Sequence, residues 1–202
     1  MVYEKLYSMK KLLSIAVILM AAQAGVAQVR PTTHFGLKAG VNLANLKIQN
    51  AADGDQRVGF HVGGLAHIHI SRQFALQPEL VFSTQGRQQT INGNKYKTNL
   101  SYINVPVLAQ YMTGSGFRLQ TGPQFGLMVG AESGIDGNEV SVKNNYDAFD
   151  ISWAVGAGYL TSSGFGFDAR YNIGLTNIND GDIRIKNRVW QFGVFYQFMH
   201  RK

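Results

Sequence analysis

Two runs of strictly alternating residues, separated by residues 161–164, limit the possible folds of this chain more than any other feature. Residues 149–160 and 165–175 place an apolar side chain, most often aromatic or branched, at every second position, with small, polar or charged residues between. Because successive side chains of a β-strand point to opposite faces, this period of two predicts a hairpin. One apolar and one polar face are typical of a barrel wall with lipid outside and a narrow polar interior.

The same alternation recurs along the chain and predicts eight strands. In most of them the large apolar side chains share one face and the polar and charged ones share the other, and the strand at 100–112 is the least regular. Leu65, Tyr102 and Met128 fall on the mostly polar faces. Pro78 lies on the apolar face of the third strand, where it predicts a weakened position in the hydrogen-bond ladder or a bulge. The predicted strands span residues 35–43, 58–70, 74–85, 100–112, 117–129, 149–160, 165–175 and 190–198.

The connections between these strands alternate in length. Long polar segments at 45–57, 86–99, 131–147 and 177–187 follow the first, third, fifth and seventh strands, and short turns follow the second, fourth and sixth. Outer-membrane barrels sort their connections in this way, with short periplasmic turns and long external loops. The expected fold is therefore all-β, an eight-stranded antiparallel up-and-down transmembrane β-barrel, closed because an unpaired edge in lipid leaves backbone groups without partners.

The N-terminal segment has the order of a secretory signal. Two lysines precede the apolar run 12–22, and small residues follow it. The run is too short for a membrane-spanning helix. We expect residues 1–27 to be a signal peptide cleaved after Ala27, with cleavage after Ala24 as the alternative, and residues 28–202 to form the barrel domain.

Composition excludes several classes of protein. The chain has no cysteine, so neither a disulfide framework nor a thiolate site is available. Only 15% of its residues are charged, which is low for a soluble surface. The formal charge of +7 is scattered rather than gathered in a basic run, so we expect no nucleic-acid partner. A preference for anionic lipid head groups is compatible with it.

Seven short motifs spread over the mature chain resemble those of the PorT-like outer-membrane β-barrel family of Bacteroidota-type bacteria. The resemblance implies a place in the outer membrane, contact with its lipid and insertion by the barrel-assembly machinery, and it implies no catalytic activity. Ser152 stands where a glycine is common in this pattern. Residues 199–202 extend past Phe198, the terminal aromatic residue that the assembly machinery reads, and this departure is expected to weaken recognition. The motifs are Gly36–Asn42, Gln77–Leu80, Gln85–Gly86, Tyr102–Pro106, Gly122–Pro123, Gly156–Tyr159 and Arg170–Asn177.

Candidate metal and catalytic groups are sparse. His67 and His69 share a strand face, with His61 farther along it, as in some strand-borne zinc sites. No third ligand has a fixed spacing to them, so we expect polar lumen residues and no metal or cofactor. No Gly-x-Ser-x-Gly motif occurs, and no serine, histidine and acid converge by spacing, so we do not expect an enzyme.

Large aromatic residues fit two interpretations. They form either a ligand platform or the aromatic belts that lie at the two membrane interfaces, and the belts are favoured. A soluble, lipocalin-like ligand-binding barrel is a further alternative, which needs an apolar interior and a polar exterior. The aromatic residues in question are Trp153, Trp190, Tyr111, Tyr159 and Tyr196.

The function that the pattern favours is a structural or interaction role, in which the external loops bind an unknown protein partner. The alternatives are a narrow passive channel or an accessory component of an outer-membrane transport or secretion system. Eight strands leave an interior that side chains can fill, so we expect no substantial pore.

Charged residues on the lumen faces predict an internal cluster. Counted from the periplasmic strand ends, Lys38, Glu79, Asp168 and Arg170 lie at comparable depth. Because isolated buried charges are costly, we predict that these four form ion pairs, with Arg118 and Asp150 nearer opposite ends of the barrel. The alternative is that each charge is hydrated separately in a wet lumen.

Overall fold

The computed structural model describes residues 32–49, 55–91, 94–135, 138–143, 146–179 and 183–198. The predicted signal peptide at 1–27 and the C-terminal extension at 199–202 lie outside the described residues. Within the described ranges, no helix has the length and apolar character that crossing a membrane requires.

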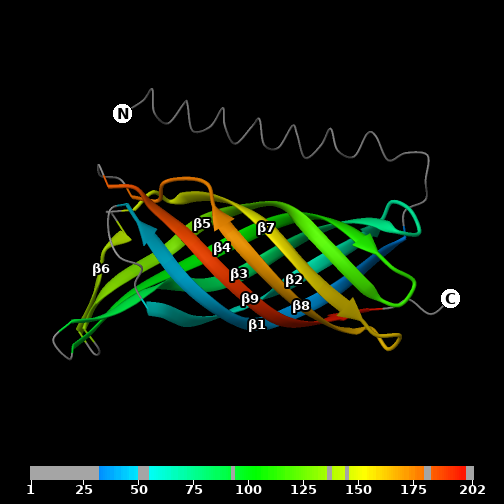
Figure 1. Ribbon diagram of the computed structural model, residues 1–202, viewed down its shortest axis with the longest axis horizontal. Helices are drawn as coiled ribbons and strands as arrows, with labels where there is room; N and C mark the ends of the chain where they lie inside the picture. The colour runs from blue at the N-terminus through cyan, green and yellow to red at the C-terminus, as the bar shows by residue number, and fades with distance from the viewer. Residues whose placement is uncertain are drawn as a thin grey trace, which may run out of the picture. The chain divides into compact units, whose positions relative to one another are not determined.

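The described chain forms a closed β-barrel (Figure 1). Eight strands pair in the ring order β1–β2–β3–β4–β5–β7–β8–β9, and β9 pairs with β1 to close it. All of these pairs are antiparallel, so the predicted fold is confirmed. The described strands are β1 (Thr33–Ile48), β2 (Asp55–His69), β3 (Phe74–Ile91), β4 (Asn94–Met112), β5 (Phe117–Ile135), β6 (Asn138–Ser141), β7 (Phe149–Leu160), β8 (Phe165–Gly174) and β9 (Ile185–Gln197).

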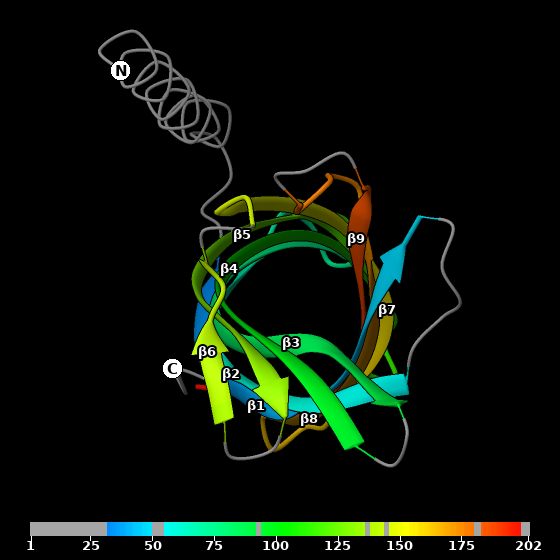
Figure 2. The ribbon, with the colours of Figure 1, turned by 90° about the vertical axis from the view of Figure 1, so that its left-hand side faces the viewer.

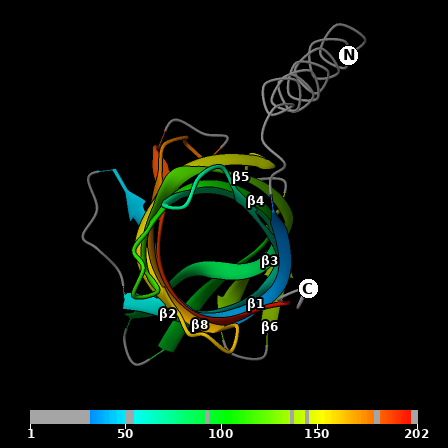
Figure 3. The same cartoon turned by 90° about the vertical axis from the view of Figure 1, so that its right-hand side faces the viewer.

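The two ends of the barrel differ. One end, which we call the short-turn end, carries the three tight turns, and β1 begins and β9 ends there (Figure 3). At the other, the long-loop end, β3, β4 and β5 run beyond the ring and β6 pairs with the end of β5 (Figure 2). The predicted alternation of short and long connections therefore places the two kinds at opposite ends.

Two of the long segments are not the loops that the sequence predicted. Residues 86–99 continue β3 and β4 as a hairpin whose register is unbroken to the pair Ile91–Asn94. Within 131–147, β5 runs on to Ile135 and pairs with β6. Both faces of these extensions lie beyond the ring, so no apolar alternation marks them as strands, although backbone pairing continues.

Hydroxyl groups fix the short turns. Thr113 Oγ1 donates a hydrogen bond to the carbonyl of Phe117 at 3.1 Å, and Thr161 Oγ1 donates to the carbonyl of Phe165 at 2.7 Å. Gly164 has a φ of 94°, in the left-handed region that favours glycine. These turns set the register of the strands that they connect, and with it the depth of each lumen side chain.

Pro78 pairs with Val107 without a shift of register, so the bulge considered there is absent. Register shifts occur instead between Gln56 and His61 on β2, and at Ser101–Tyr102 where β4 pairs with β5. Pairing around Pro78 is nevertheless interrupted, since Gln77 and Pro78 have no register partner on β2, which agrees with the predicted weakening of the ladder.

The two faces of the wall are sorted as the alternation predicted. Large apolar side chains point outward, and Phe35 and Leu80 are 65% and 61% exposed. The inward face is mostly polar and buried. This is the reverse of a lipocalin, so that alternative is wrong. Aromatic pairs lie toward both ends: Phe165 with Tyr196 at the short-turn end, ring centroids 4.8 Å apart, and Tyr171 with Trp190 farther along, 4.6 Å apart.

Candidate functional site: the lumen and the long-loop end

Four charged side chains meet in the middle of the lumen. Lys38 Nζ lies 3.1 Å from Glu79 Oε2 and 3.1 Å from Asp168 Oδ2. Arg170 donates to both carboxylate oxygens of Glu79, from Nη1 at 3.1 Å and from Nη2 at 2.9 Å. Its Nη2 also donates to Asp168 Oδ2 at 3.2 Å. The structure thus brings together the four residues that the sequence analysis selected, and we call them the ion-pair cluster.

Glycines on the adjacent strands make room for the ion-pair cluster. A Cβ atom on Gly193 would lie 2.6 Å from Asp168 Oδ1, and one on Gly156 would lie 3.0 Å from the Cα of Arg170. Gly193 is the register partner of Asp168, and Gly156 is that of Arg170. Alternating small and large lumen residues therefore allow long charged side chains to fit inside a barrel of only eight strands.

The ion-pair cluster is almost completely shielded from solvent. The side chains of Lys38, Glu79 and Arg170 are 3%, 0% and 1% exposed, and that of Asp168 is 8% exposed. Gln77 Nε2 donates a further hydrogen bond to Glu79 Oε1 at 2.8 Å. Two positive and two negative charges cancel, and the hydrogen bonds offset the cost of removing each ion from water.

An amide network fills the next layer toward the long-loop end. Asn42 is at its centre and donates to Ser83 Oγ at 2.9 Å. Its Oδ1 contacts His61 Nδ1 at 2.8 Å and accepts from Gln191 Nε2 at 3.2 Å. Asn172 Nδ2 donates to Gln191 Oε1 at 2.8 Å. Side chains from five strands are thereby joined across the lumen.

An apolar plug follows at the long-loop end. Ile178, from the connection between β8 and β9, is fully buried in it, and its backbone is fixed by hydrogen bonds to Ile185 at 2.9 Å and Asp147 at 3.0 Å. The sequence analysis did not predict this plug, although Tyr102 and Met128 lie on faces that it assigned to the lumen. The plug consists of Leu46, Leu100, Tyr102, Met128, Ala131 and Ile178, with Val142, Tyr146 and Ile185 packed against them.

The two other predicted charges lie away from the ion-pair cluster. Arg118 is near the short-turn end, and its Cζ lies 5.4 Å from the centroid of the Phe195 ring. Asp150 is near the long-loop end, where its Oδ1 accepts a hydrogen bond from Thr176 Oγ1 at 2.6 Å. Arg118 and Asp150 are therefore too far apart to form an ion pair with each other.

The histidines have structural partners. His67 Nδ1 lies 3.2 Å from Gln77 Oε1, and the His67 and His69 rings are in edge contact, 4.6 Å between centroids. His61 contacts Asn42, as described above. Among the described residues no group of three histidine or acidic side chains could hold a metal ion. The contacts of His61 and His67 are with amide oxygens, which is not the pairing of a nucleophile with its base.

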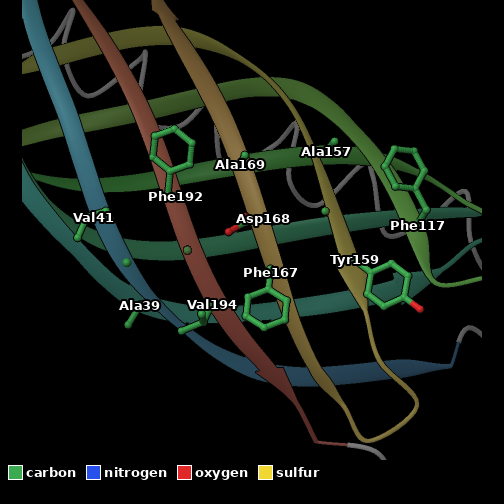
Figure 4. Close-up of a pocket in the computed structure, with 13 residues that line it drawn as sticks. Ala39, Val41, Phe117, Ala157, Tyr159, Phe167, Asp168, Ala169, Phe192 and Val194 are labelled. Carbon is green, nitrogen blue, oxygen red and sulfur yellow. The ribbon is translucent and has the colours of Figure 1, made fainter.

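The outer wall carries a shallow apolar groove of about 620 Å³ across β1, β9, β8, β7 and β5 (Figure 4). Small outward side chains, Ala39, Ala157 and Ala169, leave space between larger ones such as Phe167 and Phe192. A surface of this kind matches hydrocarbon rather than water.

A closed ring with an apolar outer wall and a filled, mostly polar interior defines an integral outer-membrane β-barrel protein. The chain belongs to the outer membrane protein beta-barrel domain family, whose sequence profile matches residues 22–180. The protein is located in the cell outer membrane. No curated protein sequence is significantly similar to the chain.

Solved structures of the same fold include Neisserial surface protein A, at a TM-score of 0.59 and 15% identity over 81% of this chain and 97% of that one. The attachment invasion locus protein Ail of Yersinia pestis matches at a TM-score of 0.53 and 15% identity, over 82% of this chain and 98% of that one. At these identities the similarity establishes the fold.

Proposed function

We propose that this protein is a non-enzymatic, non-conducting outer-membrane barrel whose long-loop end binds a protein partner outside the cell. The observation that carries the proposal is an apolar surface at that end. It consists of Tyr96, Ile135 and Val140, which are 43%, 39% and 64% exposed, and we call it the rim surface.

The three residues of the rim surface lie on the same face of three neighbouring strands. Tyr96 and Ile135 are register partners on β4 and β5, and Val140 on β6 pairs with Ser133, two residues from Ile135 on the same face. Because every second side chain of a strand points to the same face, Tyr96 shares this face with Leu100 and Tyr102 of the plug. The rim surface therefore lies on the same strand face as the buried plug, farther out along the strands, and the hydroxyl pair of Thr98 and Ser133 lies between the two.

Exposed apolar residues that adjoin one another indicate a binding surface more often than isolated ones do. In the described part of the chain, β6 pairs with β5 alone, so its other edge offers backbone groups for an added strand. Apolar side chains and an open strand edge are together the features that recognise an extended protein segment.

The filled lumen favours binding over passage. The ion-pair cluster, the amide network and the plug occupy successive levels of the interior, so the narrow-channel alternative has little support. An accessory role in transport or secretion is compatible with partner binding, and the identity of the partner distinguishes it from a purely structural role.

The test is crosslinking in native outer membrane, followed by identification of the captured partner. We expect Tyr96→Ser combined with Val140→Ser to abolish the crosslink. Ile183→Ser is the matched control, since it removes a 55% exposed apolar side chain at the same end but outside the rim surface. Equal capture by all three proteins would contradict the proposed surface.

Two finer assignments rest on the sequence and are proposals as well. Residues 1–27 are a signal peptide, and 28–202 are the barrel domain, inserted by the barrel-assembly machinery. The seven motifs given above support a PorT-like protein of Bacteroidota type. N-terminal sequencing of the protein extracted from the outer membrane tests the first assignment, since cleavage after Ala27 gives a chain that begins at Gln28.

A further inference from the structure

We propose that the short-turn end of the lumen is a binding site for phosphate or a phosphate monoester. A cavity of about 350 Å³ opens there. It is lined by Arg72, Arg118, His67, Gln197 and the turn that contains Gly114, among others, and no carboxylate is among its described lining residues. The proposal is independent of the rim surface, which lies at the opposite end.

Arg118 supplies the positive charge. The residue is 96% buried, at 4% exposure, and its Nε and Nη1 have no hydrogen-bond partner among the described residues. The guanidinium group lies over the ring of Phe195, so its face is occupied by an apolar surface. Its N–H groups project from the edge of the plane and are the groups that bind an oxyanion.

Asp168 attracts Arg118 electrostatically, but the two side chains do not form an ion pair. Asp168 is on the far side of Gly158, which is the register partner of both residues. Its Oδ2 already accepts hydrogen bonds from Lys38, Arg170 and Gln120 within the neutral ion-pair cluster. Arg118 is therefore a buried cation in excess, and the exposed Arg72 adds a second positive charge at the mouth of the cavity.

Two further polar atoms define which oxyanion fits. Gln197 Nε2 and His67 Nε2 are buried and have no partner in the described part of the chain. The Gln77 amide donates to Glu79, so it turns its Oε1 to His67 Nδ1, which consequently carries the hydrogen. His67 Nε2 in the neutral ring is then an acceptor.

A matching ligand must accept hydrogen bonds from Arg118 and Gln197 and donate one to His67. Monohydrogen phosphate and phosphate monoesters in their monoanionic form carry both bare oxygens and a hydroxyl. Sulfate carries no proton near neutral pH and lacks the donor. The unpartnered groups therefore favour phosphate over sulfate at equal charge.

The experiment is a calorimetric titration of the full-length mature protein in lipid nanodiscs with inorganic phosphate, at constant ionic strength and pH 7.5, with sulfate in parallel. We expect saturable phosphate binding that is about tenfold tighter than sulfate binding, since one hydrogen bond is lost. Arg118→Gln should weaken phosphate binding about tenfold or more. Lys186→Gln, which removes one exposed positive charge at the opposite end, should leave it within about twofold.

Folding of each variant is checked by its heat-dependent shift in gel mobility. If Arg118→Gln does not fold, Arg72→Gln serves instead, because Arg72 is an exposed turn residue, and it should weaken binding about threefold through loss of charge. Absence of saturable phosphate binding by the wild type, or equal affinities for the wild type and the arginine variant, overturns the site. Equal affinities for phosphate and sulfate overturn the role given to His67 and, with it, the choice of phosphate.

Discussion

Arg170 on β8 and Glu79 on β3 form a two-pronged ion pair across the whole width of the barrel. The two strands are four steps apart in the eight-membered ring, so they face one another. Parallel N–H to carboxylate bonds of this kind are strong and directional. The pair therefore ties opposite walls together at the level where Lys38 and Asp168 complete the cluster.

Removing one partner of this pair should lower the free energy of unfolding considerably. Glu79→Gln leaves two buried cations with one carboxylate, so we expect a loss of about 3–5 kcal/mol in the free energy of unfolding. Glu139→Gln is the control, since Glu139 is exposed, and it should cost under about 1 kcal/mol. Urea unfolding in lipid vesicles measures both.

A double-mutant cycle with Arg170→Gln isolates the pair itself. Because the two residues are in direct contact, we expect their effects to be non-additive by about 1–3 kcal/mol. Additive effects would mean that the two side chains do not meet in the folded protein, which would support separate hydration of each charge.

The glycines around the ion-pair cluster should resist substitution. Gly193→Ala places a methyl group 2.6 Å from Asp168 Oδ1 and 3.0 Å from His61 Nε2, so we expect a loss of about 1–3 kcal/mol from overpacking. Gly64→Ala is the control, because a Cβ there has no neighbour closer than 3.7 Å. Similar unfolding curves for the two variants would contradict the tight packing.

The plug should contribute to stability through burial. Ile178→Ala removes part of a fully buried side chain, so we expect a loss of about 2–5 kcal/mol in the free energy of unfolding. Ile183→Ala, in the same connection but 55% exposed, should change it by less than about 0.5 kcal/mol. A small effect at both positions would show that the connection does not pack into the lumen.

The membrane-crossing wall was predictable because each strand there meets two different environments. Lipid on one side and a polar lumen on the other impose the alternation seen in residues 149–160, and the lengths of the connections then set the ring. Where both faces meet the same environment, as in residues 86–99, the pattern disappears and the strands were missed.

The ion-pair cluster could be predicted from the sequence, whereas the plug could not. Counting from the turns places Lys38 and Asp168 at similar depth, since a regular ladder converts position into depth; the contacts themselves depend on the ring order. Ile178 gave no comparable signal, because a connecting segment has no period that says where it folds back. The sequence placed Arg118 near one end of the lumen. That its Nε and Nη1 have no hydrogen-bond partner among the described residues could be seen only in the structure.

The most direct test of a filled barrel is the conductance of the wild-type protein, refolded and inserted into planar lipid bilayers. With the ion-pair cluster, amide network and plug in place, we predict no steady conductance above that of the protein-free bilayer. Large, stable current steps of uniform size would show that ions pass through the lumen, and they would contradict both the closed interior and the binding role built on it.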